Sequence, residues 1–121
     1  MVAILPTTDH EIAAACCAPE LAPRLAHDAL KQLTDDLAIV NHPIRLQILD
    51  MLAQREGQVC VCDLEAALPV KQPTVSHHLK LLREAGLIDC ERRGLWAHYF
   101  IRRDAVQQLR NRILSSFDCI C

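Results

Sequence analysis

The chain has 121 residues, 51% of them hydrophobic, which suffices for one hydrophobic core and is too short for two ordinary domains. Charged residues make up 23%, so the composition excludes an intrinsically disordered chain, and no apolar run approaches the roughly 18 residues that would span a membrane. The formal net charge of −2 argues by itself against a nucleic-acid partner, because domains that bind nucleic acids usually carry a basic surplus.

An N-terminal arm precedes the first predicted helix. Residues 1–19 show no sustained hydrophobic period and contain the adjacent cysteines Cys16 and Cys17. From Glu20 onward leucines recur every three to five residues, which predicts a helix with a proline in its first turn. Pro43 is placed to begin a second helix.

Two short helices joined by a tight turn follow. The segment 59–68 predicts a short helix closed by Pro69. The next helix starts at Pro73 and stops at Gly86, in the usual C-terminal position for glycine, and only one of its faces is apolar. Two short helices with so short a connection form the helix-turn-helix arrangement.

A β-hairpin and a final helix complete the chain. Residues 87–92 and 95–101 are two extended runs that flank a turn containing glycine, which is a hairpin signature. Asp104 is placed to cap a last helix that carries a narrow apolar stripe. The predicted fold is therefore mainly α with a β-hairpin wing, a winged helix-turn-helix. It divides the chain into an arm (1–19), a winged helix-turn-helix domain (20–117) and a cysteine-containing tail (118–121).

The net charge is the sum of two opposed parts. Residues 1–70 contain four basic and ten acidic residues, a net of −6, whereas residues 71–112 contain nine basic and four acidic residues, a net of +5. The basic part coincides with the second helix of the helix-turn-helix and the hairpin. A local field of one sign steers a charged ligand whatever the total charge is, so the local charge favours DNA as a partner.

The second helix of the helix-turn-helix carries the side chains that a recognition helix needs. Short polar groups near its N-terminus can reach base edges, and cations hold phosphates. The residues that fit are Gln72, Thr74, Ser76, His77 and Lys80. Further phosphate contacts, sensitive to salt, are expected from Lys71, Arg83, Arg92 and Arg93. The alternative to DNA binding is that these residues simply form a solvent-exposed helix face beside a charged turn.

Three sequence blocks resemble the ArsR/SmtB family of metal-sensing repressors. The segment QPTVSHHLKLLREAGL (72–87) resembles its recognition helix, NHPIRLQIL (41–49) its D-P-x-R-L-x-I-L helix, and VCVCDL (59–64) its metal box. The resemblance covers about residues 20–117. It implies a homodimeric winged-helix repressor, dimerised through its first and last helices, that leaves an inverted-repeat operator in double-stranded DNA when its effector binds.

The chain departs from that family pattern at two places. Many relatives have an arginine directly after the hairpin glycine, whereas here Leu95 and Trp96 follow it. The phosphate contacts of the wing must then rest on the two arginines before the glycine. Three residues after Cys62, where arsenic sensors of one type have a third cysteine, this chain has Glu65.

The seven cysteines point to metal binding or redox chemistry. Their number is odd and no signal peptide opens the sequence, which argues against a secreted disulfide scaffold. We therefore expect a cytoplasmic protein, where cysteines more often bind metal. Thiolates select soft ions such as As(III), Cd(II), Pb(II) or Zn(II). As(III) takes three sulfurs in a pyramid, whereas zinc usually takes four ligands.

The metal box supplies two sulfurs, from Cys60 and Cys62, so a third must come from elsewhere. An adjacent cysteine pair followed by Ala-Pro resembles the N-terminal arm of arsenite sensors that share the Cys-Val-Cys box. The resemblance implies the ligand set Cys16, Cys17, Cys60 and Cys62, with As(III) as the inducer. Family sensors of cadmium and lead also combine arm and box cysteines. Cd(II), Pb(II) and Zn(II) therefore stay open as inducers, as does reversible disulfide formation in the arm.

The remaining cysteines and the histidines of the recognition helix have other expected roles. Cys90 fits a small buried residue of a strand. Cys119 and Cys121 fit either a second thiol site or a frayed terminus. We expect His77 to face DNA and His78 to be structural. The last helix has no histidine, so we expect no zinc or cobalt site on it.

Two further alternatives are a thiol-dependent arsenate reductase and a metal buffer that does not bind DNA. The sequence has no Cys-x-x-Cys motif and no Gly-rich phosphate loop, and its histidines show no spacing to a nucleophile. The basic segment argues against a simple buffer. We therefore predict a regulator and not an enzyme.

Overall fold

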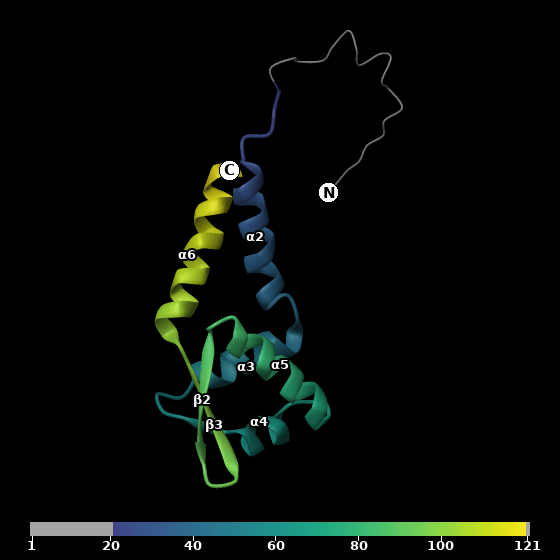
Figure 1. Ribbon diagram of the computed structural model, residues 1–121, viewed down its shortest axis with the longest axis vertical. Helices are drawn as coiled ribbons and strands as arrows, with labels where there is room; N and C mark the ends of the chain where they lie inside the picture. The colour runs from purple at the N-terminus through teal and green to yellow at the C-terminus, as the bar shows by residue number, and fades with distance from the viewer. Residues whose placement is uncertain (1–20, 121) are drawn as a thin grey trace.

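The computed structural model describes residues 21–120 of the chain. It is mainly helical with one small antiparallel sheet, as expected for a winged helix-turn-helix (Figure 1). Its elements, in chain order, are α2 (His27–Val40), α3 (Pro43–Ala53), β1 (Val59–Cys60), α4 (Val61–Ala67), α5 (Gln72–Glu84), β2 (Ile88–Arg93), β3 (Trp96–Ile101) and α6 (Arg103–Ile120).

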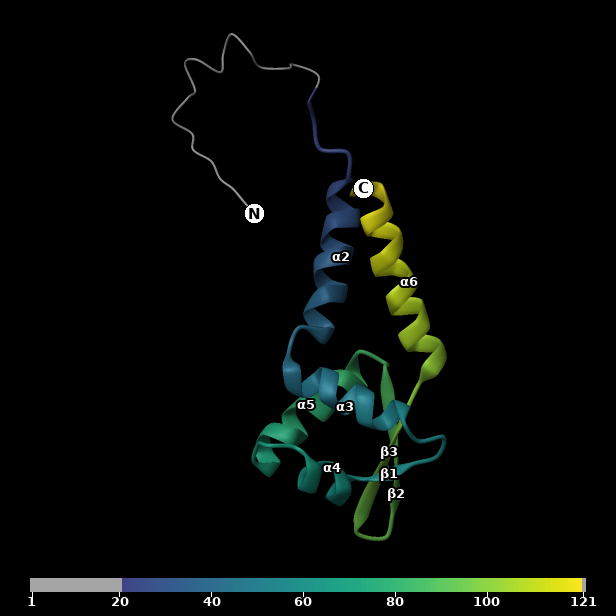
Figure 2. The ribbon, with the colours of Figure 1, turned by 180° about the vertical axis from the view of Figure 1, so that it is seen from behind.

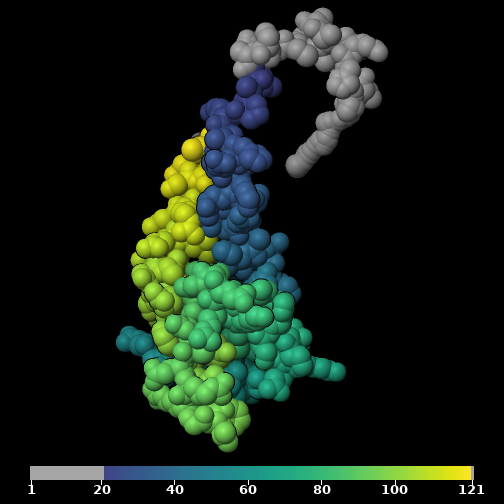
Figure 3. All heavy atoms as spheres, in the orientation of Figure 1, coloured from purple at the N-terminus to yellow at the C-terminus, as the bar shows by residue number. Residues whose placement is uncertain are grey.

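Helices α2 and α6 lie side by side and project from one end of the molecule (Figure 1 and Figure 2). We call this pair of helices the stalk. The other helices and the sheet form a broader body, as the space-filling view also shows (Figure 3). The turn of the β2–β3 hairpin lies at the end of the body opposite the stalk.

The hydrophobic core lies in the body, where α3, α4, α5 and the sheet meet. Its fully buried side chains come from these elements and are Ile48, Leu52, Leu64, Val75, Leu79, Leu82 and Ile88. The apolar residues of α5 share one face of the helix. Burial of this face fixes the rotation of α5 about its axis and leaves the polar face outside.

Local signals set the ends of α3 and α5. Pro43 is the first residue of α3, and His42 caps this helix, because the backbone N–H of Ile44 donates to His42 Nδ1 at 3.1 Å. Pro73 is the second residue of α5, and Gly86 follows the helix with a φ of 82°. Glycine adopts such an angle without strain, so Gly86 ends the helix as predicted.

The sheet has the strand order β1-β3-β2, with antiparallel pairing throughout. Arg93 pairs with Trp96, so Gly94 and Leu95 form a two-residue turn. Gly94 has a φ of 63°, which suits the first position of a tight hairpin turn. The predicted hairpin is confirmed, with each strand end within one residue of its expected position.

The first helix starts later than predicted. It begins at His27 and not at Glu20, and Leu21 is 86% exposed. Pro23 disfavours helical backbone at the residue before it, which keeps this part of the chain outside the helix. The regular spacing of the leucines also overstated their burial, because Leu33 is the only leucine of α2 that is buried.

The predicted helix over residues 59–68 and the predicted cap of the last helix also differ from the structure. The first two residues of that segment form β1 against β3, and α4 begins only at Val61. Their backbone groups are satisfied by a strand distant in the sequence, a contact that local spacing does not reveal. Helix α6 begins at Arg103, so Asp104 lies in its first turn, where a carboxylate is favourable.

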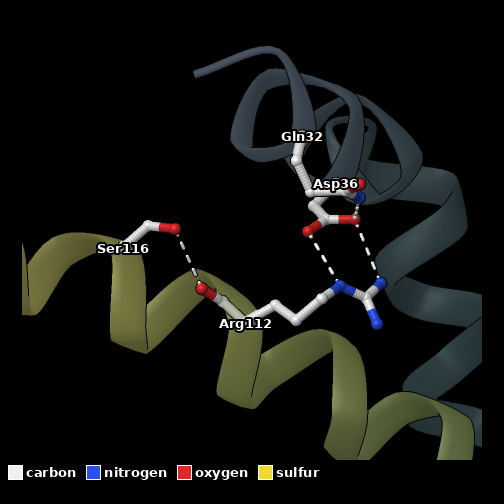
Figure 4. Close-up of polar contacts among 4 residues, drawn as sticks. All are labelled: Gln32, Asp36, Arg112 and Ser116. Carbon is white, nitrogen blue, oxygen red and sulfur yellow. Dashed lines mark hydrogen bonds and ion pairs between the residues drawn. The ribbon is translucent and has the colours of Figure 1, made fainter. Parts of the chain in front are cut away.

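An ion pair joins the two helices of the stalk (Figure 4). The Arg112 guanidinium donates from Nε to Asp36 Oδ2 and from Nη2 to Asp36 Oδ1, both at 3.1 Å. The Asp36 side chain is only 3% exposed, and Gln32 Nε2 donates to its Oδ1 at 3.0 Å. The hydrogen bonds from Arg112 hold the pKa of Asp36 below its usual value, against the opposing effect of burial. This two-point contact fixes how α2 and α6 sit against each other.

Arg45, on α3, connects the end of α2 to α5. Its Nε donates to the carbonyl of Ile39 at 2.7 Å, and its Nη2 donates to the carbonyl of Ala38 at 3.1 Å. Its Nη1 lies 3.2 Å from Nδ1 of His78, on α5. A guanidinium can only donate, so His78 Nδ1 accepts and the His78 ring is neutral. One side chain therefore links three helices.

His78 is buried where these helices meet. His78 is 5% exposed, and its ring lies against the ring of His42, with the two ring centroids 4.1 Å apart. Burial lowers the pKa of His78, and the neighbouring charges of His42, Arg45 and His77 lower it further. This burial fits the structural role expected for His78.

Arg112→Ala is expected to lower the free energy of unfolding by about 1–3 kcal/mol, because it leaves the buried Asp36 carboxylate without its cation. Urea unfolding followed by circular dichroism measures the change. The matched control is Lys31→Ala, which removes an exposed ion pair within α2 and should cost less than about 0.5 kcal/mol. Equal losses for the two variants would contradict the importance of the buried pair.

Folding stability is expected to fall in mild acid because of His78. Its pKa is lowered from 6.5 by folding, so the unfolded state binds the proton more readily. The stability that the neutral ring contributes is complete above pH 6.5 and is lost as the pH falls through 6.5 toward the lowered pKa.

His78→Gln keeps a neutral acceptor for Arg45 and should lose less stability than the wild type between about pH 7.5 and about pH 5.5. Urea unfolding at the two pH values measures the difference. His77→Gln, at the exposed neighbouring position, removes only the smallest of the causes that lower the pKa of His78 and should keep most of the wild-type pH dependence. The same pH dependence in the wild type and His78→Gln would show that His78 is not the responsible group.

Candidate nucleic-acid interface and thiol site

Helix α5 places the predicted recognition residues on its exposed side. The core takes the opposite side of the helix, as described above. The exposed residues include every predicted one on this helix: Gln72, Thr74, Ser76, His77, Lys80 and Arg83. Lys71, directly before the helix, is exposed as well. The helix-turn-helix thus presents amide, hydroxyl, imidazole and cationic groups together on one surface.

A cleft of about 450 Å³ lies between α5 and β3. It is lined by Ser76, Lys80, Arg83, Glu84 and Tyr99. The sequence alone did not predict a role for Tyr99. Alternating side chains show that a strand has two faces, but they do not show which of the two faces turns toward α5. Burial raises the pKa of the Tyr99 hydroxyl, which stays protonated and can donate a hydrogen bond at this surface.

The wing carries its two predicted cations beside the turn. Arg92 and Arg93 are both exposed, and Arg93 Nε lies 3.6 Å from Glu91 Oε1. Because this ion pair is long and exposed, solvent screens it and it is weak. Both arginines therefore stay available to bind phosphates. Arg83 differs, because its Nε donates to Asp89 Oδ1 at 3.1 Å and thereby braces α5 against β2.

Cys60 and Cys62 lie together at the start of α4. Cys60 caps the helix, because its Sγ accepts a hydrogen bond from the backbone N–H of Cys62 at 3.4 Å. The Cys62 thiol donates to the Cys60 sulfur, and the two sulfurs are 2.7 Å apart. This hydrogen bond raises the pKa of the Cys62 thiol. Cys62 is exposed and Cys60 is half-buried, so a soft ion could reach both sulfurs from one side.

The other cysteines lie away from this pair or outside the described residues. Cys16, Cys17 and Cys121 are outside them. Cys119 is exposed near the end of α6, and Cys90 is half-buried on β2. Between residues 21 and 120, no three cysteine, histidine or acidic side chains gather closely enough to hold a metal ion. A three-sulfur site at the box therefore needs a ligand from outside this range or from a second copy.

Residues 42–89, which contain the helix-turn-helix, match the family model described as bacterial regulatory protein, arsR family. The chain is 42% identical over 67 residues to an uncharacterized HTH-type transcriptional regulator of Methanocaldococcus jannaschii, a match that covers 55% of this chain and 74% of that protein. It is 49% identical over 55 residues to an arsenical resistance operon repressor of Escherichia coli. That second match covers 46% of each chain, so it spans less than half of the relative's length.

The fold has a similar counterpart among solved structures. A crystal structure of a possible transcriptional regulator for arsenical resistance matches with a TM-score of 0.61 at 30% identity, over 69% of this chain and 83% of that one. None of the helices described for this chain is long and apolar enough to cross a membrane. Because the exposed recognition helix, the wing and the sequence matches agree, the chain belongs to the ArsR family of bacterial regulatory proteins, which are DNA-binding transcriptional regulators and not enzymes.

Proposed function

We propose that the chain is a transcriptional repressor that binds operator DNA as a homodimer and leaves it when As(III) binds its cysteine thiolates. The observation that carries DNA binding is the polar face of α5, which burial of the opposite face holds outward. The side chains of α5 can reach base edges, and the arginines of the wing can hold phosphates. These are the two kinds of contact that a specific protein–DNA interface requires.

The surface of the stalk supports the homodimer. Several of its large apolar side chains are 36–55% exposed, namely Leu30, Leu37, Leu114, Phe117 and Ile120. A cleft of about 260 Å³ between α3 and α6, lined mainly by apolar side chains, extends this surface. A second copy would bury these side chains. Two-fold symmetry would then place one recognition helix on each half of an inverted repeat.

The exposed thiol pair supports an inducer that binds sulfur. Each thiol that binds As(III) replaces one hydroxide of arsenous acid and releases water, and three sulfurs complete the pyramid. Cys60 and Cys62 supply two of them, and Cys16 or Cys17 of the arm supplies the third. All four sulfurs together form the ligand set that a four-coordinate soft ion would use. The proposal includes a cytoplasmic location, where thiols stay reduced.

The names of similar proteins favour As(III) over other soft ions. The E. coli relative is an arsenical resistance operon repressor, and the solved structure is that of a possible regulator for arsenical resistance. Cd(II), Pb(II) and Zn(II) bind the same kind of sulfur ligand, and oxidation of the arm cysteines would use the same atoms. Cys119 and Cys121 are the candidates for a second thiol site, separate from the box.

The position of the box explains how inducer binding would reach the DNA. Helix α4 packs against α5, and β1 pairs with β3 of the wing. Cys60 lies where β1 ends and α4 begins, so a displacement of its sulfur shifts both DNA-contacting elements. Typical allosteric couplings of about 1–3 kcal/mol change an affinity by about 5- to 150-fold, which is enough to empty an operator.

Arsenite is expected to release a promoter-derived duplex from the wild-type chain in a fluorescence-anisotropy titration. Cys60→Ser should need at least about tenfold more arsenite, because the box then keeps one sulfur. Cys90→Ser, which alters a cysteine on β2, is the matched control and should respond like the wild type. Cys16→Ser and Cys17→Ser test the arm in the same titration.

Release of Cys60→Ser at the arsenite concentration that releases the wild type would overturn the assignment of the box. The same titration with Cd(II), Pb(II) and Zn(II) tests the choice of ion. Release by one of these ions, with none by arsenite, would overturn As(III) as the inducer.

A further inference from the structure

The turn of the wing exposes two large apolar side chains. Leu95 is 89% exposed and Trp96 is 52% exposed, and neither contributes to the hydrophobic core. The turn that carries them lies at the end of the body opposite the stalk (Figure 1 and Figure 2). Single exposed apolar residues are common on protein surfaces. Two large neighbours at the turn of a projecting hairpin need a different explanation.

The turn itself does not require these side chains. Gly94 supplies the positive φ, and the next position of such a turn accepts a small polar residue at least as well as leucine. Trp96 occupies the last paired position before the turn, opposite Arg93. Exposed apolar surface is unfavourable in water, and no packing within residues 21–120 offsets it for Leu95. The pair therefore fits a contact with another molecule.

The surrounding charge indicates the class of that molecule. Arg92 and Arg93 directly precede the turn, and both are exposed. Within residues 21–120, no ion pair involves Arg92. The partner of Arg93 is Glu91, whose other oxygen accepts a hydrogen bond from Gln58 Nε2 at 3.2 Å. An apolar apex flanked by two available cations is complementary to a polyanion with apolar edges, such as a nucleic-acid duplex.

The hairpin also has the reach to contact a second groove of the duplex that α5 would bind. Tyr99 of β3 lines the cleft with α5, and from there the hairpin continues four residues to Leu95, about 13 Å at about 3.3 Å per residue before the side chain at the apex is added. A major groove and the neighbouring minor groove of B-DNA are separated by about half a helical turn, or about 17 Å. With α5 in a major groove, the apex of the hairpin would therefore meet the neighbouring minor groove.

We propose that Leu95 is an apolar wedge that enters this minor groove, while Arg92 and Arg93 bind the flanking phosphates and Trp96 covers the adjacent sugar. This inference rests on the DNA-binding function proposed above. An apolar side chain inserted from the minor groove partly unstacks a base step and bends the duplex. Pyrimidine–purine steps unstack most easily, so the wedge would add a sequence preference without a polar base contact.

The experiment compares Leu95→Ser with Leu21→Ser, a matched leucine that is 86% exposed and lies outside the body. The probe is a duplex that the wild-type chain selects from a random-sequence library, with 2-aminopurine at the steps beneath the wing. Leu95→Ser should weaken binding by about 5- to 20-fold and remove the rise in 2-aminopurine fluorescence. Leu21→Ser should change neither.

Two further measurements separate a wedge from a phosphate contact. Leu95→Ser should keep the wild-type dependence of affinity on salt, whereas Arg92→Ala should reduce that slope by about 1. Trp96 is the only tryptophan in the chain, so its intrinsic fluorescence reports on the wing alone. Its emission should change when the wild-type chain binds the duplex.

The outcomes distinguish the wedge from the function on which it rests. If the wild type selects a duplex, and Leu95→Ser binds it equally well with the same 2-aminopurine signal, the wedge is wrong and the proposed function stands. If the wild type selects no duplex, the proposed function fails and the wedge fails with it. A Trp96 response to vesicles of anionic phospholipid, with none to the duplex, would assign the apex to a membrane and overturn the inference.

Discussion

The arrangement of the helices depends on Arg45. Helix α2 has no basic residue in its last turn, so the carbonyls left open at its end need donors from elsewhere. Arg45 donates to the carbonyls of Ala38 and Ile39 and turns a further N–H group to His78. One charged group thus fixes the direction in which α2 leaves the body and ties the end of α2 to α5, whose rotation is set by burial of its apolar face. The position of the stalk relative to the DNA-facing surface follows from these contacts.

Two sets of polar contacts, one on each side of α2, link α6 to α5. Arg112 holds Asp36 on α2 (Figure 4). Arg45 holds the end of α2 and also contacts His78. Together these contacts connect the stalk, where a second copy would bind, to the recognition helix without passing through the box. The box contacts the same helix from another direction, through α4. Helix α5 therefore lies between the two regions from which a dimer and an inducer would act on it, and packed networks of this kind can carry such coupling.

Local signals in the sequence were sufficient to predict α5 and the hairpin. Pro73 and Gly86 mark the ends of α5, and its 3.6-residue period separates the polar from the buried residues, so the exposed face could be predicted. Contacts between distant segments could not be predicted in this way. Strand β1 exists because β3 lies beside it, and Tyr99 lines a cleft with α5 because of how the hairpin packs. The links made by Arg45 likewise depend on helix ends that meet only in the folded chain.

The basic segment is less available to DNA than its net charge suggests. Arg103 donates to the carbonyls of Ala53 and Arg55, and Arg112 is bound within the stalk, so these two cations serve the fold. The remaining cations lie mainly on α5 and the wing, and one of them, Arg83, also braces β2. Each phosphate contact contributes about 0.9 to the slope of log affinity against log salt concentration, so few contacts give weak non-specific binding. Contacts to the bases would then supply most of the operator affinity, and a small displacement of α5 that breaks some of them would be enough to release the DNA.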